Sequence, residues 1–210
     1  MMKNNFWRFT VVTVVQFFLI LFFLSSCVDL TTEIELNVDG SGSIRLVYAA
    51  SRAMINLGTI DEENRFYALP VSEDDFLATV DQVEGLELSS FRLDEEVDTL
   101  QIEATLDFES IDVLSELFSS SGPGAIELVQ NGGTVYKHTI YGGSGEEIDP
   151  DSRELIETFF SEDSVELSLD APRAIQSVNI GDFSGSEARV ELAMTDILFS
   201  QEPVIWEVRW

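Results

Sequence analysis

Short segments in which polar and apolar residues alternate recur along this chain, and turn sequences separate them. The first pair is 32–38 and 43–48, joined by Asp39-Gly40-Ser41-Gly42. A period of two favours a strand with one buried and one solvated face, and two such strands across a glycine-containing turn predict a β-hairpin. The side chains expected on its buried face are Ile34, Leu36, Val38, Ile44, Leu46 and Tyr48.

The same pattern predicts later strands at 86–93, 99–108, 125–130, 134–141, 165–169, 175–180, 188–194 and 204–210. Between them, apolar residues at helical spacing predict helices at 51–57, 72–84, 110–118 and 151–160. The Ser/Gly/Pro stretch at 119–124 is the best candidate for a linker. Antiparallel hairpins forming a sheet, with several short helices packed on it, indicate the α+β class.

The first 26 residues have the features of a signal peptide. Lys3 and Arg8 make a short positive region, and 9–24 is an apolar run interrupted by only three polar residues. A transmembrane helix needs about 20 apolar residues, so this run is closer in length to the hydrophobic region of a signal peptide.

The residues that follow the apolar run resemble the bacterial lipobox. Leu24, Ser25 and Ser26 precede Cys27, which is the only cysteine in the chain. The resemblance implies cleavage before Cys27 by signal peptidase II, after a diacylglyceryl group is attached to its sulfur. A single cysteine allows no intramolecular disulfide, and lipidation removes a reactive thiol from an exported protein. The alternative is a signal anchor in which Cys27 is incidental.

The lipobox divides the chain into a signal peptide at 1–26 and one extracytoplasmic α+β domain at 27–210, with a candidate sub-boundary near 119–124. Only a few residues separate Cys27 from the first alternating segment. We therefore expect the folded domain to lie close to a membrane of the cell envelope, on its periplasmic or cell-surface face.

The charge of the chain excludes two kinds of partner. Its 39 acidic and 11 basic residues give a net charge of −28, and all of the acids but only nine of the bases follow Cys27. Nucleic acids and anionic bilayers are bound through clustered Lys and Arg, so neither is expected to bind this domain by charge. The acidity is typical of proteins in saline surroundings, and it would also attract a basic partner.

Catalytic motifs are not evident in the sequence. His138 is the sole histidine, and as part of a predicted strand it shares a face with Tyr136 and Ile140, a pattern that favours ordinary packing. The stretch 181–185 lacks the spacing of a nucleophile elbow. Lys137 is the only lysine after the leader, and no phosphate-binding loop surrounds it. We expect neither catalysis nor a cofactor.

Calcium is the most plausible metal, because it prefers carboxylate and carbonyl oxygens from flexible loops. The weak candidates are Glu146, Glu147, Asp149 and Asp151, with the 39–42 turn as a second loop. Neither loop fits the EF-hand pattern. Acids are also favoured before a helix N-terminus whether or not a metal binds, so the sequence predicts no defined metal site.

The whole layout resembles the LppM-type lipoprotein ectodomains. It combines a lipobox, an immediate hairpin with an Asp-Gly-x-Gly turn and a body that ends on a Trp-bearing strand, but it lacks that family's second hydrophobic segment. The resemblance implies a non-enzymatic envelope module that holds a hydrophobic or lipid ligand between sheet and helices. We expect a lipid-anchored protein that binds such a ligand or an envelope protein. The alternatives are a structural role in envelope assembly and, less favoured, a hydrolase.

Overall fold

The computed structural model describes residues 30–52, 70–121, 126–130, 133–145 and 148–210. The signal segment, Cys27, most of the helix predicted at 51–57, and the calcium candidates Glu146 and Glu147 lie outside these residues. The predictions made for them therefore stay predictions.

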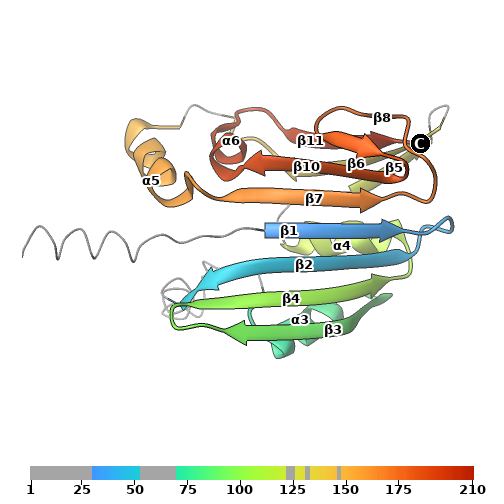
Figure 1. Ribbon diagram of the computed structural model, residues 1–210, viewed down its shortest axis with the longest axis horizontal. Coiled ribbons are helices and arrows are strands. Elements are labelled where there is room, and N and C mark those ends of the chain that lie inside the picture. The colour runs from blue at the N-terminus through green and yellow to red at the C-terminus, as the bar shows by residue number, and fades with distance from the viewer. Residues whose placement is uncertain (1–29, 53–69, 122–125, 131–132, 146–147) are drawn as a thin grey trace, which may run out of the picture.

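The described residues form two sheets and four helices, which confirms the α+β class (Figure 1). Sheet A has the strand order β3-β4-β2-β1-β7-β10-β9 and sheet B has the order β5-β6-β11-β8. Sheet A contains β1 (Leu30–Leu36), β2 (Gly42–Ser51), β3 (Leu86–Glu95), β4 (Thr99–Phe108), β7 (Ser164–Asp170), β9 (Asp182–Ser184) and β10 (Glu187–Ala193). Sheet B contains β5 (Ile126–Gln130), β6 (Thr134–Tyr141), β8 (Ser177–Val178) and β11 (Val204–Arg209). The helices are α3 (Glu73–Val80), α4 (Ile111–Ser121), α5 (Pro150–Phe160) and α6 (Met194–Phe199).

The first hairpin has the register that its alternation predicts. Ile34 pairs with Ile44 across β1 and β2, and both side chains are buried. Val38 was expected on the same face but is 76% exposed. β1 ends at Leu36, two residues before the alternation does, because the backbone N–H of Asn37 donates to the carbonyl oxygen of Ser41 over 2.8 Å.

Sheet A is assembled from two antiparallel parts that meet at a parallel pair. β1 runs parallel to β7, with Ile34 beside Leu169, whereas the other described strand pairs of this sheet are antiparallel. This single parallel contact places the N-terminal hairpins and the antiparallel pair of β7 and β10 in one sheet.

One continuous core lies against the inner face of sheet A. Helices α3 and α4 lie on one side of the sheet in Figure 1, and side chains from these helices and from sheet B join the same apolar cluster. Phe76 of α3 and Leu114 of α4 are buried, as are Tyr136 and Trp206 of sheet B. The opposite, outer face of sheet A carries polar side chains on successive strands, so this face is where a ligand can approach the sheet.

Local capping explains where two of the helices begin. The hydroxyl of Ser72 accepts from the backbone N–H of Asp75 at the start of α3, and the carboxylate of Asp149 accepts from the N–H of Ser152 at the start of α5. Helix α4 continues to Ser121, through the first part of the stretch predicted as a linker. None of the helices in the described residues is long and apolar enough to cross a membrane.

The strand predicted at 204–210 lies inside sheet B. β11 lies between β6 and β8, and Trp206, Val208 and Trp210 are buried along one face. The strand predicted at 175–180 is reduced to the two residues of β8. The side chain of Asn179 replaces ladder bonds there, donating to Ile205 O and accepting from Glu207 N.

Candidate functional site

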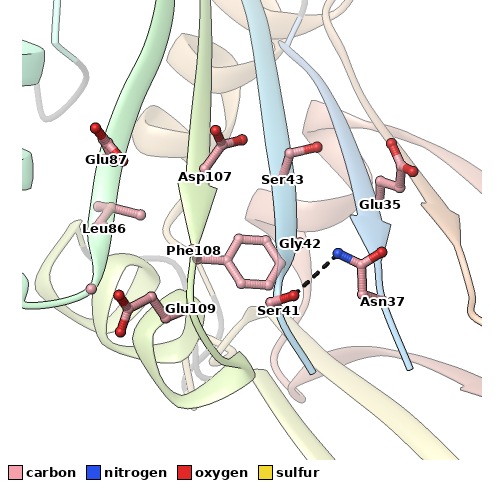
Figure 2. A pocket seen from close by; sticks show the side chains of 11 residues that line it. Glu35, Asn37, Ser41, Gly42, Ser43, Leu86, Glu87, Asp107, Phe108 and Glu109 are labelled. Carbon is pink, nitrogen blue, oxygen red and sulfur yellow. Dashed lines mark hydrogen bonds between the residues drawn. The ribbon is translucent and has the colours of Figure 1, made fainter. Parts of the chain in front are cut away.

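A row of acidic side chains crosses the outer face of sheet A. Each member is the cross-strand partner of the next, so the row runs over six strands from β3 to β10. Its members are Glu87, Asp107, Ser43, Glu35, Asp170 and Glu187. The first four lie side by side in Figure 2. Cross-strand partners point to the same face of a sheet, so five carboxylates share one solvent-facing line with one serine.

The row lies in a groove formed by two adjoining depressions. One has a volume of about 650 Å³ and extends from Glu35 to Glu87, and the other, of about 670 Å³, extends from Glu35 to Glu187. Glu35 and Ser43 line both, so the two depressions are continuous. The groove is open to solvent and is lined mainly by carboxylates and serines, together with Arg45 on one side and the apolar Leu86 and Phe108 at one end.

The turn between β1 and β2 lines one side of this groove through Asn37 and Ser41, and it is held by its own hydrogen bonds. The carboxylate of Asp39 accepts from both the hydroxyl and the backbone N–H of Ser41, which lowers the pKa of Asp39. Gly40 has a φ of +90°, which favours glycine. At Gly42, a Cβ would lie 2.0 Å from the carbonyl oxygen of Glu35 and 2.6 Å from the Phe108 ring. Glycine at position 42 therefore permits the close approach of β1 and of Phe108.

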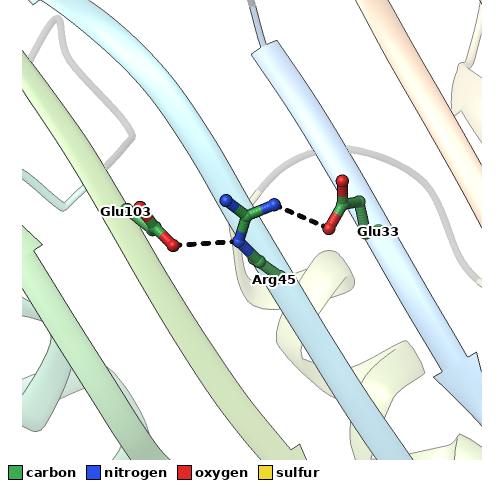
Figure 3. A network of polar contacts seen from close by, with 3 residues as sticks. All are labelled: Glu33, Arg45 and Glu103. Atoms are coloured by element: carbon green, nitrogen blue, oxygen red, sulfur yellow. Dashed lines mark hydrogen bonds and ion pairs between the residues drawn. The ribbon is translucent and has the colours of Figure 1, made fainter.

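Arg45 makes the main ionic contact on the outer face and lines one side of the groove (Figure 3). Its guanidinium donates to Glu33 over 2.7 Å and to Glu103 over 3.0 Å, linking β1, β2 and β4. The hydrogen bonds to Glu33 and then to Glu103 raise the pKa of Arg45. The two acids nearest to Arg45 thus satisfy its guanidinium, and it does not neutralise the acidic row.

In the described part of the chain, the ion pairs of the basic side chains are with acids outside the row. Among the described residues, Arg189 pairs with Glu166 and Arg92 pairs with Asp94, both outside the row. Asp107 accepts a hydrogen bond from the hydroxyl of Ser89. No ion pair to the five row carboxylates is found in the described part of the chain. Their like charges repel one another, and an external cationic group would relieve that repulsion.

The loops predicted as weak calcium candidates do not form a metal cluster where they are described. Asp149 and Asp151 are exposed at the start of α5, and the hydrogen bond from Ser152 lowers the pKa of Asp149. Asp149 thus acts as a helix cap. Across the described ranges, no three His, Cys, Asp or Glu residues are placed to hold a metal ion together.

His138 is buried in the inner face of sheet B, as its alternation predicts. It is 2% exposed, and its ring lies 4.9 Å from the ring of Phe118, centroid to centroid. Burial lowers the pKa of His138 to about 4, and burial raises the pKa of Tyr136, whose hydroxyl lies 3.4 Å from Nδ1 of His138. A neutral imidazole enclosed among aromatic rings is a packing residue in this structure, and it is remote from solvent.

Lys137 points to the opposite side of β6 and pairs with Glu207 on β11 over 2.8 Å. The hydrogen bond from Lys137 to Glu207 raises the pKa of Lys137. Its ammonium group therefore stays charged and is engaged in a cross-strand pair, which is a common arrangement on the solvated face of a sheet.

The sequence did not reveal the acidic row. Glu87, Asp107, Glu35, Asp170 and Glu187 are spread over 153 positions of a chain with 39 acids, and no spacing distinguishes them. The alternation of polar and apolar residues does place each of these carboxylates on the polar face of its strand. The strand order needed to align them depends on the β1–β7 contact, for which the sequence carries no local signal.

The fold is similar to that of the folded domain of the LppM protein of Mycobacterium tuberculosis, determined by NMR. The two structures superpose with a TM-score of 0.50 at 14% sequence identity, over 88% of this chain and 90% of that chain. This likeness supports the LppM-type architecture at the level of the fold alone. No family model matches the sequence, and no curated protein matches it.

Proposed function

We propose that this chain is an extracytoplasmic lipoprotein of the cell envelope, held to a membrane by a lipid on Cys27. The support is the order of a positive leader, an apolar run and Leu24-Ser25-Ser26-Cys27, followed at once by a folded domain. The LppM-type fold agrees with this assignment, because the layout of the sequence already resembles that family of lipoprotein ectodomains.

The anchor has a direct test. Cys27→Ala should abolish fatty-acid labelling of the chain and leave the larger, unprocessed precursor, since both steps require the cysteine sulfur. Cys27 is the only cysteine, so no other thiol can accept the lipid. Unchanged labelling in this variant would contradict the proposal.

The domain binds a protein of the envelope, and it does so through the groove on the outer face of sheet A. The observation that carries this function is the line of five carboxylates in a solvent-open groove, with no ion pair to them in the described residues. Its line of carboxylates suits a basic segment of a protein better than an acyl chain. The exposed large apolar side chains of the described residues lie on six different elements and turns, so they form no patch on one element.

A photo-crosslinking amino acid at Ser43, in the middle of the groove, tests this binding in intact cells. We expect an adduct that disappears with Glu35→Lys, because a cation in the row repels a basic partner. Glu191→Lys is the matched control: Glu191 is exposed on the same face but lies outside the groove. An adduct that survives Glu35→Lys, or is lost equally in both variants, would contradict the assignment of the groove.

A hydrophobic ligand between the sheets is the second candidate, and one observation favours it. Nε2 of His138 and Nε1 of Trp206 are buried without a hydrogen-bond partner in the described residues, and the two residues are cross-strand neighbours on β6 and β11. They could receive the polar end of an apolar molecule. Native mass spectrometry of the domain purified without 1–27 tests this idea, and a domain that carries no copurified molecule would contradict it.

Catalysis is not part of the proposal. The only histidine is enclosed in the core, and the residues described as lining the groove include carboxylates, hydroxyls and the ion-paired Arg45 but no histidine or lysine. A hydrolase would need a general acid or base with an altered pKa within reach of a substrate. His138 is the one described residue with a strongly lowered pKa among the candidates, and it lies away from the groove.

A further inference from the structure

We propose that the bilayer which holds the Cys27 lipid lies against the end of sheet A where β1 begins, in contact with the β3–β4 turn at 96–98 and with helix α5. The strands of sheet A then stand upright on the membrane, and the acidic groove lies toward the end of the sheet that is far from it. This orientation rests on the proposed lipid anchor, and it adds which surface of the domain meets the membrane.

The tether, which is the segment between Cys27 and β1, is short. Leu30 is the first residue of β1, and three Cα-to-Cα steps separate it from Cys27. A fully extended chain spans at most about 3.6 Å per residue, so the acylated cysteine lies within about 11 Å of Leu30. The bilayer surface must therefore be equally close to the start of β1.

The strands beside β1 extend beyond its first residue at this end of sheet A. Leu30 pairs with Tyr48, but β2 and β4 continue for three more residues, to the pair Ser51 and Thr99. Three residues of strand span about 10 Å. The β3–β4 turn therefore extends as far beyond Leu30 as Cys27 can reach, so a bilayer that receives the lipid also meets this turn.

The β3–β4 turn is held by hydrogen bonds and carries an exposed apolar side chain. Val97 is 87% exposed. Arg52 holds the turn from β2: its guanidinium pairs with Glu95 over 2.6 Å, and its backbone N–H donates to the carbonyl oxygen of Asp98 over 2.9 Å. These bonds hold the turn, and with it Val97, in a fixed position relative to sheet A.

Helix α5 provides a second contact at the same end (Figure 1). It leads within a few residues into β7, where Val165 pairs with Leu30. Leu155 of α5 is 58% exposed. A valine and a leucine at this end can enter the headgroup region, whereas Val38, which is 76% exposed, lies in the β1–β2 turn at the opposite end.

The charges at this end of sheet A indicate which kind of bilayer surface it can approach. Glu95, Glu96 and Asp98 lie around Val97 and are exposed, and of these three carboxylates Arg52 pairs with that of Glu95. Acids are repelled by an anionic leaflet, so the surface that fits this end is zwitterionic. The lipid supplies the binding energy, and the protein surface sets the orientation.

The orientation is testable on the full lipidated chain in phosphatidylcholine vesicles that carry nitroxide-labelled headgroups. A single fluorophore is attached through Val97→Cys, Leu155→Cys or, as the control, Val38→Cys. We expect quenching at positions 97 and 155 to exceed quenching at 38 several-fold. We also expect added phosphatidylserine to reduce quenching at position 97.

Two failures can be told apart by first measuring fatty-acid labelling of Cys27. An acylated chain that is quenched as strongly at 38 as at 97 would overturn the orientation and leave the anchor intact. A chain with no acyl group would overturn the anchor and the orientation together. Stronger quenching at 97 with phosphatidylserine would overturn the assignment of a zwitterionic surface.

Discussion

The interior between the sheets and the outer face of sheet A use the same strands but opposite chemistry. On β4, Ile102, Ala104 and Leu106 point inward and are buried, and Glu103, Thr105 and Asp107 alternate with them on the outer face. Apolar burial stabilises the interior at about 25 cal/mol per Å². The outer face carries charges that repel one another, so the inner face supplies the stability and the outer face is free to serve binding.

The largest expected difference between the two faces is the cost of truncating a side chain. Ile102→Ala on the inner face should lower the free energy of unfolding by about 2–5 kcal/mol, because it removes buried methyl groups and leaves a cavity. Thr105→Ala on the outer face of the same strand should change it by less than about 0.5 kcal/mol. Urea denaturation of both variants measures this, and equal losses would contradict the division of roles.

The pH dependence of stability gives the next largest effect and concerns the interior alone. Burial lowers the pKa of His138 to about 4 in the folded protein, against 6.5 as the ordinary value. The unfolded chain therefore binds more protons between these pH values, and the stability present above pH 6.5 is lost as the pH falls toward 4. Between pH 6.5 and pH 5 we expect a loss of about 2 kcal/mol from this residue.

His138→Leu is the control for this prediction, because it removes the titrating group. Denaturation curves collected from pH 7 to pH 5 should show a smaller slope in the variant than in the parent chain. Carboxylates titrate mostly below this range, which keeps the comparison specific to the histidine. Parallel slopes in the two proteins would show that His138 is not buried in its neutral form.

Local pattern was enough to predict most strands and helices, because each hairpin brings together neighbours in sequence. Ile34 and Ile44 could be paired from alternation and a visible turn, and they are paired. Leu30 and Val165 could not, since 134 intervening residues separate them and nothing in either segment specifies the other. The acidic groove depends on that contact, so it emerges only from the three-dimensional structure.

The errors in the predicted elements arise where side chains replace backbone hydrogen bonds. At Val38 the alternation continues, but the hydrogen bonds of Asn37 and Asp39 with Ser41 have already begun the turn. In the segment 175–180, the side-chain amide of Asn179 makes two hydrogen bonds to the backbone of β11 in place of backbone–backbone bonds, and the strand is shorter as a result. Periodicity describes which face a side chain occupies, and it does not register such local competition.

A smaller effect is expected from the ion pairs of the outer face. Arg45→Met should reduce stability by about 1 kcal/mol at low salt, because Glu33 and Glu103 then face each other without their shared cation. Arg189→Met is the control with a single acidic partner and should cost less. Both losses should shrink as salt is added, since both sites are partly exposed. A loss at Arg45 that is insensitive to salt would indicate a packing role for its side chain.

The smallest expected effect on stability comes from removing one negative charge from β1. Its sign should differ between a carboxylate of the acidic row and an ion-paired carboxylate beside it. Glu35 and Glu33 lie on the same strand and the same face, but Glu33 pairs with Arg45 and Glu35 lies in the acidic row. Glu35→Gln should therefore stabilise the domain at low salt, by up to about 0.5 kcal/mol, whereas Glu33→Gln should destabilise it. Chemical denaturation at low and high salt measures both, and the two changes should converge toward zero as salt screens the charges. Two changes of the same sign at low salt would mean that the row carboxylates do not repel one another enough to favour a cationic partner.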